Sequence, residues 1–231
     1  MSRRMFLTCL IVVQAAISLR MCNAEETTSD SLPTLAPPIC LGGPLTQCKW
    51  LDEPSGITIC SEGSWPADPA FDVPPTTQHL ILYNIKFPNR ENSFRFSHLI
   101  NLTVLQIEYS ESCDLTTGAT VPFLFQNLVA SLDRSTMRTL FFTHIHFETI
   151  DDDFFAGFSG LESVEFDNCR IKEFTRRSFS PLAMGAPVSS LPGARNTSSF
   201  KQLRVVHAAE LTEFAWEVLY PVAESLEGSP S

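Results

Sequence analysis

The residue types that nucleophilic catalysis and metal binding require occur at few places in the sequence. Cys169 carries a thiol, and His144 and His146 offer two imidazoles separated by one residue. A zinc site needs three or four ligands at recognised spacings, and no Cys, Asp or Glu stands at such a spacing from the two histidines. Solvated histidines are therefore favoured over a metal-binding pair.

Two further groups have suitable side chains but the wrong spacing. The three acids at 151–153 lack the pattern of an EF-hand loop, and acids at the start of a helical turn are expected from capping and the helix dipole. The tetrapeptide at 157–160, GFSG, is not the G-x-S-x-G nucleophile elbow. The sequence therefore predicts a protein without catalytic residues, metal site or cofactor; no residue set supports the alternative of a secreted hydrolase.

Composition narrows the class of protein further. The 231 residues include 16 Lys and Arg against 26 Asp and Glu, which gives a net charge of −10, and 44% are hydrophobic. This length and hydrophobic fraction indicate one folded domain, or one domain with a tail, rather than a disordered chain. Binding nucleic acid regardless of sequence requires an excess of basic residues, so no nucleic-acid partner is expected.

The N-terminus has the layout of a secretory signal peptide. Arg3 and Arg4 precede an apolar run, and small residues precede a cleavage point after Ala24. We expect a signal peptide at 1–24, a flexible leader at 25–38, and a secreted, extracellular protein. No later stretch has the length of a transmembrane helix, so the mature chain is expected to have no membrane span; an uncleaved anchor is the alternative.

Glycosylation sequons and cysteines fit a secretory route. Asn101 and Asn196 each begin an Asn-x-Ser/Thr sequon and are the candidate N-glycosylation sites. The cysteines beyond the cleavage point are Cys40, Cys48, Cys60, Cys113 and Cys169.

Apolar residues in the middle of the chain repeat at a fixed offset. Each residue of one series is followed 24 residues later by its counterpart in a second series. The first series is Met137, Leu140, Phe142, Ile145, Phe147, Ile150, Phe155 and Phe158, and the second is Leu161, Val164, Phe166, Cys169, Ile171, Phe174, Phe179 and Leu182. A period in this range is typical of a solenoid, and less regular copies begin near Thr77, Leu102 and Phe200.

This pattern resembles the leucine-rich repeat L-x-x-L-x-L-x-x-N/C-x-L, in the form found in Toll-like and Slit-like extracellular proteins. Cys169 stands at the Asn/Cys position, which implies a buried, inert thiol, whereas Ile85, Ser110, Ile145 and Ala208 depart from the motif. The resemblance implies an α/β solenoid with short parallel strands on its concave face and short helices or 3-10 turns on its convex face. About five repeats would span 77–214, with inserts near 111–121 and 183–199, and a longer helix is expected over 122–133.

The ends of such a solenoid need caps. The segment at 39–76 is similar to the cysteine-bearing N-terminal cap of extracellular family members, although it lacks their Cys-x-Cys pair. Cys40, Cys48, Cys60 and Cys113 are the disulfide candidates, and four cysteines permit three pairings. The segment at 215–231 is expected to close the other end without cysteines and to continue into a tail.

The strand register predicts which side chains face outward on the concave face. Apolar and aromatic residues there lie beside acids, a combination that favours a protein interface. The residues predicted to bind a partner are Ile81, Tyr83, Gln106, Glu108, Phe141, Thr143, Glu165, Asp167 and Arg204. We expect non-catalytic recognition of a protein ligand or receptor with a basic surface. The alternatives are a membrane-held receptor or adhesion ectodomain in truncated form, and a self-associating matrix protein.

Overall fold

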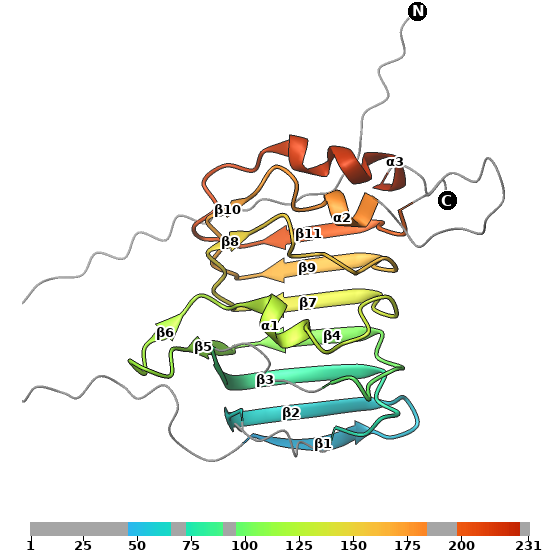
Figure 1. The fold of residues 1–231 in the computed structure, drawn as a ribbon, viewed down its shortest axis with the longest axis vertical. Coiled ribbons are helices and arrows are strands. Elements are labelled where there is room, and N and C mark those ends of the chain that lie inside the picture. Colours follow the sequence, from blue (N-terminus) through green and yellow to red (C-terminus); the bar gives the residue numbers. More distant parts are fainter. Residues whose placement is uncertain (1–45, 66–72, 90–95, 184–197, 227–231) are drawn as a thin grey trace, which may run out of the picture.

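The structure is a computed structural model in which residues 46–65, 73–89, 96–183 and 198–226 are described. The predicted signal peptide and leader, Cys40, Asn196 and most of the second insert lie outside the described residues. The described part contains two sheets and a few short helices (Figure 1).

The larger sheet has nine strands in the described residues, seven of which follow one another in the order β1-β2-β3-β4-β7-β9-β11. Strand β5 pairs with β3, and β6 pairs with β5. The strands are β1 (Gln47–Asp52), β2 (Ile57–Ser64), β3 (His79–Pro88), β4 (Val104–Glu108), β5 (Glu111–Cys113), β6 (Thr120–Val121), β7 (Thr139–Thr143), β9 (Ser163–Asp167) and β11 (Gln202–Val206).

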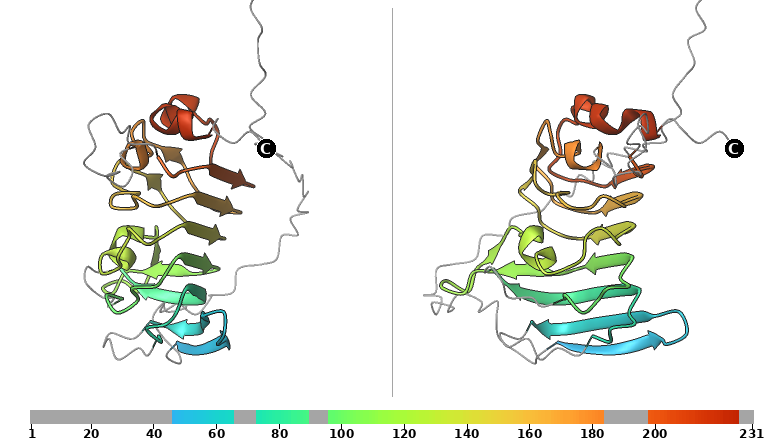
Figure 2. Two further views of the ribbon diagram at one scale, coloured as in Figure 1. Left: turned by 90° about the vertical axis from the view of Figure 1, so that its right-hand side faces the viewer. Right: turned by 45° about the vertical axis from the view of Figure 1, so that its right-hand side comes forward.

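The remaining elements are short. A two-stranded parallel sheet pairs β8 (Thr149–Ile150) with β10 (Glu173–Phe174). The helices are α1 (Phe125–Val129), α2 (Ser180–Ala183), the 3-10 helix η1 (Trp216–Val222) and α3 (Ala223–Leu226). Figure 2 shows α1 and the two-stranded sheet on one side of the large sheet.

The leucine-rich-repeat solenoid predicted from the 24-residue period is wrong. The described residues form mainly one mixed sheet, with antiparallel pairs at β1–β2 and β5–β6 and few short helices. The helix expected over 122–133 is reduced to α1, and the residues after the acids at 151–153 form turns. Apolar spacing reports which side chains are buried, but it does not determine strand direction or the form of the chain between strands.

Alternation within the strands nevertheless places the core as expected, because successive side chains of a strand point to opposite faces. Leu80, Leu105, Leu140, Val164 and Leu203 are register partners along β3, β4, β7, β9 and β11, and all five are buried. The parallel pairing expected for Leu140 and Val164 on adjacent strands is confirmed.

Phenylalanine rings fill the core behind the centre of the sheet. Phe142 of β7 is fully buried, and its ring centroid lies 5.1 Å from that of Phe125 and 5.2 Å from those of Phe147 and Phe166. Phe125 belongs to α1 and stacks on Phe154 at 4.8 Å. The short helix is thus attached to the sheet by aromatic packing, since a helix of five residues has little stability of its own.

A hairpin forms the N-terminal end of the sheet. Cys48 of β1 and Cys60 of β2 are register partners and form a disulfide. The hairpin turn contains Gly56 at φ +63°, a left-handed conformation that glycine adopts without strain. Cys113 is also disulfide-bonded. The Cys48–Cys60 bond occurs in one of the three ways in which the four candidate cysteines can pair.

Candidate functional site

One face of the large sheet carries side chains that are half-buried or exposed, and we call it the open face. Its residues alternate with the buried ones along six strands, and α1 lies on the opposite side (Figure 2). The open face consists of Ile57, Ile59, Ser61, His79, Ile81, Tyr83, Val104, Gln106, Glu108, Thr139, Phe141, Thr143, Ser163, Glu165, Asp167, Gln202, Arg204 and Val206.

All nine residues predicted to bind a partner lie on the open face, in two adjacent rows defined by the strand register. The rows cross the strands, so residues distant in sequence become neighbours. The first row is Ile81, Gln106, Phe141, Glu165 and Arg204, and the second is Tyr83, Glu108, Thr143 and Asp167. Ile59 and Ser61 of β2 extend these rows and were not predicted, because the sequence pattern was traced only from Thr77 onward. Partner binding by these residues stays a prediction.

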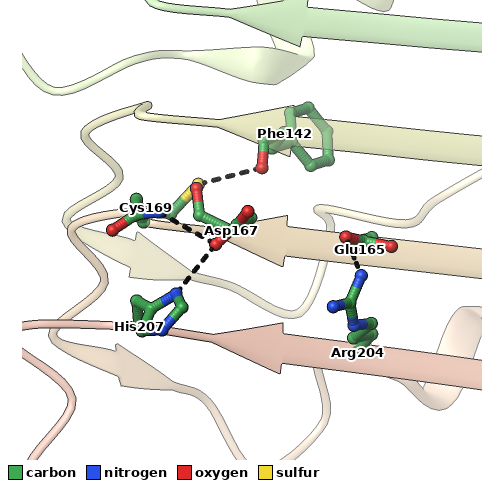
Figure 3. Close-up of polar contacts among 7 residues, drawn as sticks. Phe142, Glu165, Asp167, Cys169, Arg204 and His207 are labelled. Carbon is green, nitrogen blue, oxygen red and sulfur yellow. Dashed lines mark hydrogen bonds and ion pairs between the residues drawn. The ribbon is translucent and has the colours of Figure 1, made fainter. Parts of the chain in front are cut away.

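Two acids at the C-terminal part of the open face meet side chains of the neighbouring segment (Figure 3). Arg204 Nη1 lies 2.5 Å from Glu165 Oε1, and His207 Nδ1 lies 3.2 Å from Asp167 Oδ1. Each pair joins β9 to β11 or to the residue that follows it. Because these side chains are partly exposed to solvent, the two pairs contribute little to stability. They do engage Glu165 and Asp167, two of the three acids predicted to bind a partner.

The third predicted acid has a different environment. Gln106 donates a hydrogen bond to Glu108 Oε1, and Gln106 Oε1 in turn contacts His79 Nε2 at 3.0 Å. Among the described residues no Lys, Arg or His forms an ion pair with Glu108. The open face therefore carries an uncompensated carboxylate on β4.

Two aromatic residues that the sequence reasoning missed lie beside this carboxylate. Tyr109 and His144 follow β4 and β7, and their rings stack with centroids 4.3 Å apart. Tyr109 also meets Tyr83 edge-on at 5.6 Å. Tyr83 is 37% exposed and Tyr109 is 45% exposed. Alternation within the strands assigns no face to the residue after a strand, so neither ring was predicted to join the site.

A shared backbone conformation explains where these rings point. In the described ranges, six non-glycine residues follow or interrupt the strands with φ between 49° and 55°: Glu62, Asn84, Tyr109, His144, Asn168 and His207. Left-handed backbone favours Asn and His among non-glycine residues, so Tyr109 and Glu62 are the unusual members. Such a conformation costs about 1–3 kcal/mol. The Tyr109 amide is held by a 2.9 Å hydrogen bond to the Thr143 carbonyl.

Cys169 has the environment of a structural thiol. Its side chain is buried, and Sγ donates to the Phe142 carbonyl at 3.3 Å (Figure 3). Burial raises the pKa of the Cys169 thiol to about 12. Ser110 has a corresponding place after β4, where its hydroxyl donates to the Glu108 carbonyl at 2.9 Å. A polar side chain at this place satisfies backbone groups where the chain leaves the strand.

The Cys169 thiol is expected to resist alkylation in the folded protein. With its pKa near 12, the thiol is protonated at pH 8, and only the thiolate is the nucleophile. Iodoacetamide at pH 8 should leave Cys169 unmodified until urea is added, as measured by mass mapping of its peptide. Equal labelling with and without urea would contradict the buried position.

The other candidates for chemistry remain separate from the open face. His146 is partly buried, and burial lowers the pKa of its imidazole. Asp151 accepts a 3.1 Å hydrogen bond from the Asp153 amide, which is the capping arrangement that the sequence favours. Within the described ranges no group of three His, Cys, Asp or Glu side chains is placed to hold a metal ion.

The structure locates the first sequon, and its glycosylation stays a prediction. Asn101, the first sequon, is exposed in the turn before β4. In the part of the chain that the structure describes, no helix has the length and apolarity to cross a membrane.

Comparison with known proteins gives no family for this chain. No protein-family model matches the sequence, and no curated protein matches it either.

Proposed function

We propose that the protein is a secreted, non-catalytic recognition protein that binds another protein through the open face. The observation that carries this proposal is the open face itself, on which apolar and aromatic side chains remain accessible across adjacent strands. The six strands of the open face are paired in parallel. Parallel sheets are usually covered on both faces, so an accessible face on such strands supports contact with a partner.

The composition of the open face supports a protein partner. Ile81 and Phe141 are half-buried in one row, and Tyr83 is exposed in the next. Aromatic residues surrounded by polar ones are typical of the energetically important centre of an interface. The polar surround comprises the carboxylates, amides and hydroxyls of the same two rows.

Charge supports a basic partner surface. The chain has a net charge of −10, and Glu108 adds an uncompensated carboxylate to the open face. Complementary charge accelerates association and disfavours acidic competitors. We therefore expect association to slow as the salt concentration rises.

The extracellular location is part of the proposal. It is based on the N-terminal sequence pattern that ends at Ala24, and disulfides such as Cys48–Cys60 persist in oxidising compartments. No step of the proposal depends on a catalytic residue or a cofactor.

Replacing the accessible rings is expected to weaken partner binding. The protein would be screened against arrayed extracellular proteins, and each hit would be measured by biolayer interferometry. Tyr83→Ala combined with Phe141→Ala should raise the dissociation constant by about tenfold or more, because such rings account for much of the binding energy. Both side chains point away from the core, so the variant should stay folded.

Tyr220→Ala is the matched control, because Tyr220 is a 71% exposed tyrosine on η1 rather than on the open face. It should leave the dissociation constant unchanged. Hits that respond to Tyr220→Ala but not to the open-face variant would place recognition elsewhere and overturn the proposal.

A further inference from the structure

We infer that one corner of the open face binds an arginine side chain of the protein partner. The corner consists of Tyr83, Glu108, Tyr109 and His144, and we call it the aromatic corner. This inference rests on the proposed function and specifies the chemistry of the contact.

The rings of the aromatic corner form a continuous surface that runs from Tyr83 within β3 to Tyr109 and His144, which directly follow β4 and β7. Tyr83 meets Tyr109 at 5.6 Å with an interplanar angle of 64°, and Tyr109 stacks on His144 at 4.3 Å with an angle of 18°. Both tyrosines are more than one-third exposed. The electron-rich faces of exposed tyrosines attract cations, and guanidinium also stacks flat on them.

A carboxylate in the same corner adds a charge for a cation to meet. Glu108 is the register partner of Tyr83 and the chain neighbour of Tyr109. Its Oε1 accepts from Gln106, whereas Oε2 has no hydrogen-bond partner within the described part of the chain. Glu165 and Asp167 already meet Arg204 and His207, so Glu108 is the predicted acid left for an incoming cation.

The backbone at Tyr109 is an independent reason to assign a role to its ring. Tyr109 adopts φ 49°, a conformation in which Asn, His or Gly is expected. Four of the six non-glycine residues in this conformation are Asn or His. The ring of Tyr109 is also exposed and therefore contributes little to the core. A strained backbone under an exposed aromatic side chain points to binding.

Arginine fits the aromatic corner better than lysine does. Its planar guanidinium stacks on aromatic rings and donates several hydrogen bonds in a fork that matches a carboxylate. One such group can lie against a tyrosine face while it donates to Glu108. A lysine ammonium is a more strongly hydrated point charge and lacks this second contact.

The test is a titration of the isotope-labelled full chain with N-acetyl-arginine amide, followed by NMR. The expected result is saturable shifts of the amides of Tyr83, Glu108, Tyr109 and His144, with a dissociation constant on the order of millimolar. The citrulline analogue has the same shape without the charge and should cause no shifts. Equal shifts with citrulline, tighter binding of the lysine amide, or shifts centred on 151–153 would each overturn the inference.

Two variants test the assigned contacts without disturbing the core. Glu108→Gln should weaken arginine binding by about fivefold or more, whereas Glu173→Gln, at an exposed acid on β10 outside the open face, should leave it within about twofold. Tyr109→Asn removes the ring and places a residue that accepts the left-handed backbone. It should therefore weaken binding while the protein stays folded, and unchanged binding in this variant or in Glu108→Gln would overturn the inference.

The two proposals fail in distinguishable ways. If the arginine probe does not bind but Tyr83→Ala with Phe141→Ala weakens a protein partner, the aromatic corner is wrong and the proposed function stands. If the probe binds as expected but every protein hit ignores the open-face variants, the proposed function is wrong.

Discussion

Replacing Phe142 with alanine is expected to lower the free energy of unfolding by about 3–5 kcal/mol, the range for a fully buried phenylalanine. Phe142 has no exposed surface and contacts rings from α1, from the segment after β7 and from β9. Removing it leaves a cavity at the centre of the sheet that these rings cannot fill without leaving their own positions.

The neighbouring residue is the matched control. Phe141 is on the same strand and of the same type, but it points to the open face. Phe141→Ala should therefore lower the free energy of unfolding by only about 1 kcal/mol. Urea unfolding followed by circular dichroism measures both variants. Equal losses in the two variants would contradict the assignment of core and open face.

Removing the hairpin disulfide is expected to have the second-largest effect. Cys48→Ala with Cys60→Ala should lower the free energy of unfolding by about 2–4 kcal/mol, because the bridge restricts the unfolded chain. The bridge spans a sequence separation of 12 residues and lies against the core, where Cys60 is fully buried. Part of the loss comes from the smaller alanine side chain at that position.

Urea unfolding without reductant measures this effect, and the reduced wild-type protein provides a comparison. Reduction also opens the disulfide of Cys113, so the reduced wild type should be at least as unstable as the double variant. A difference below about 1 kcal/mol between the variant and the oxidised wild type would show that the bridge does not restrict the unfolded chain as expected.

The sequence predicted the buried residues from the alternation of apolar side chains, and it predicted which strands are neighbours from the 24-residue offset between the two series. Leu140, Phe142, Val164 and Phe166 are buried and paired as their spacing indicates. These positions depend on local patterns that a single sequence contains.

The solenoid prediction failed where the fold depends on turns and short helices. Pro54-Ser55-Gly56 is a turn signal, and it joins β1 to β2 as an antiparallel hairpin. The sequence prediction assigns these residues to the N-terminal cap at 39–76 and therefore does not use them as the turn of a hairpin. The helix expected over 122–133 is reduced to five residues although its apolar stripe of Phe125, Leu128, Val129 and Leu132 is buried. Burial of a helical stripe therefore does not fix the length of the helix, and a helix this short is held by its packing.

The candidate site was predicted only in part for a related reason. The outward residues follow from alternation, but their charge pairing depends on register across long insertions. Glu165 and Arg204 are separated by 39 residues in sequence and still meet. Tyr109 and His144 belong to the candidate site because each adopts a positive φ directly after its strand. Tyrosine is uncommon in this conformation, so its residue type did not predict the backbone angle.

Alternation along the strands has a consequence for how this surface can change. Phe141 and Phe142 are consecutive, yet one belongs to the open face and the other to the core. If the proposed function holds, stability and binding specificity depend on two interleaved sets of positions, and additive effects are expected for residues that share no contacts. A library randomised only at every second strand position would vary the binding preference of the molecule while its scaffold stays constant, which is the property sought in an engineered affinity reagent.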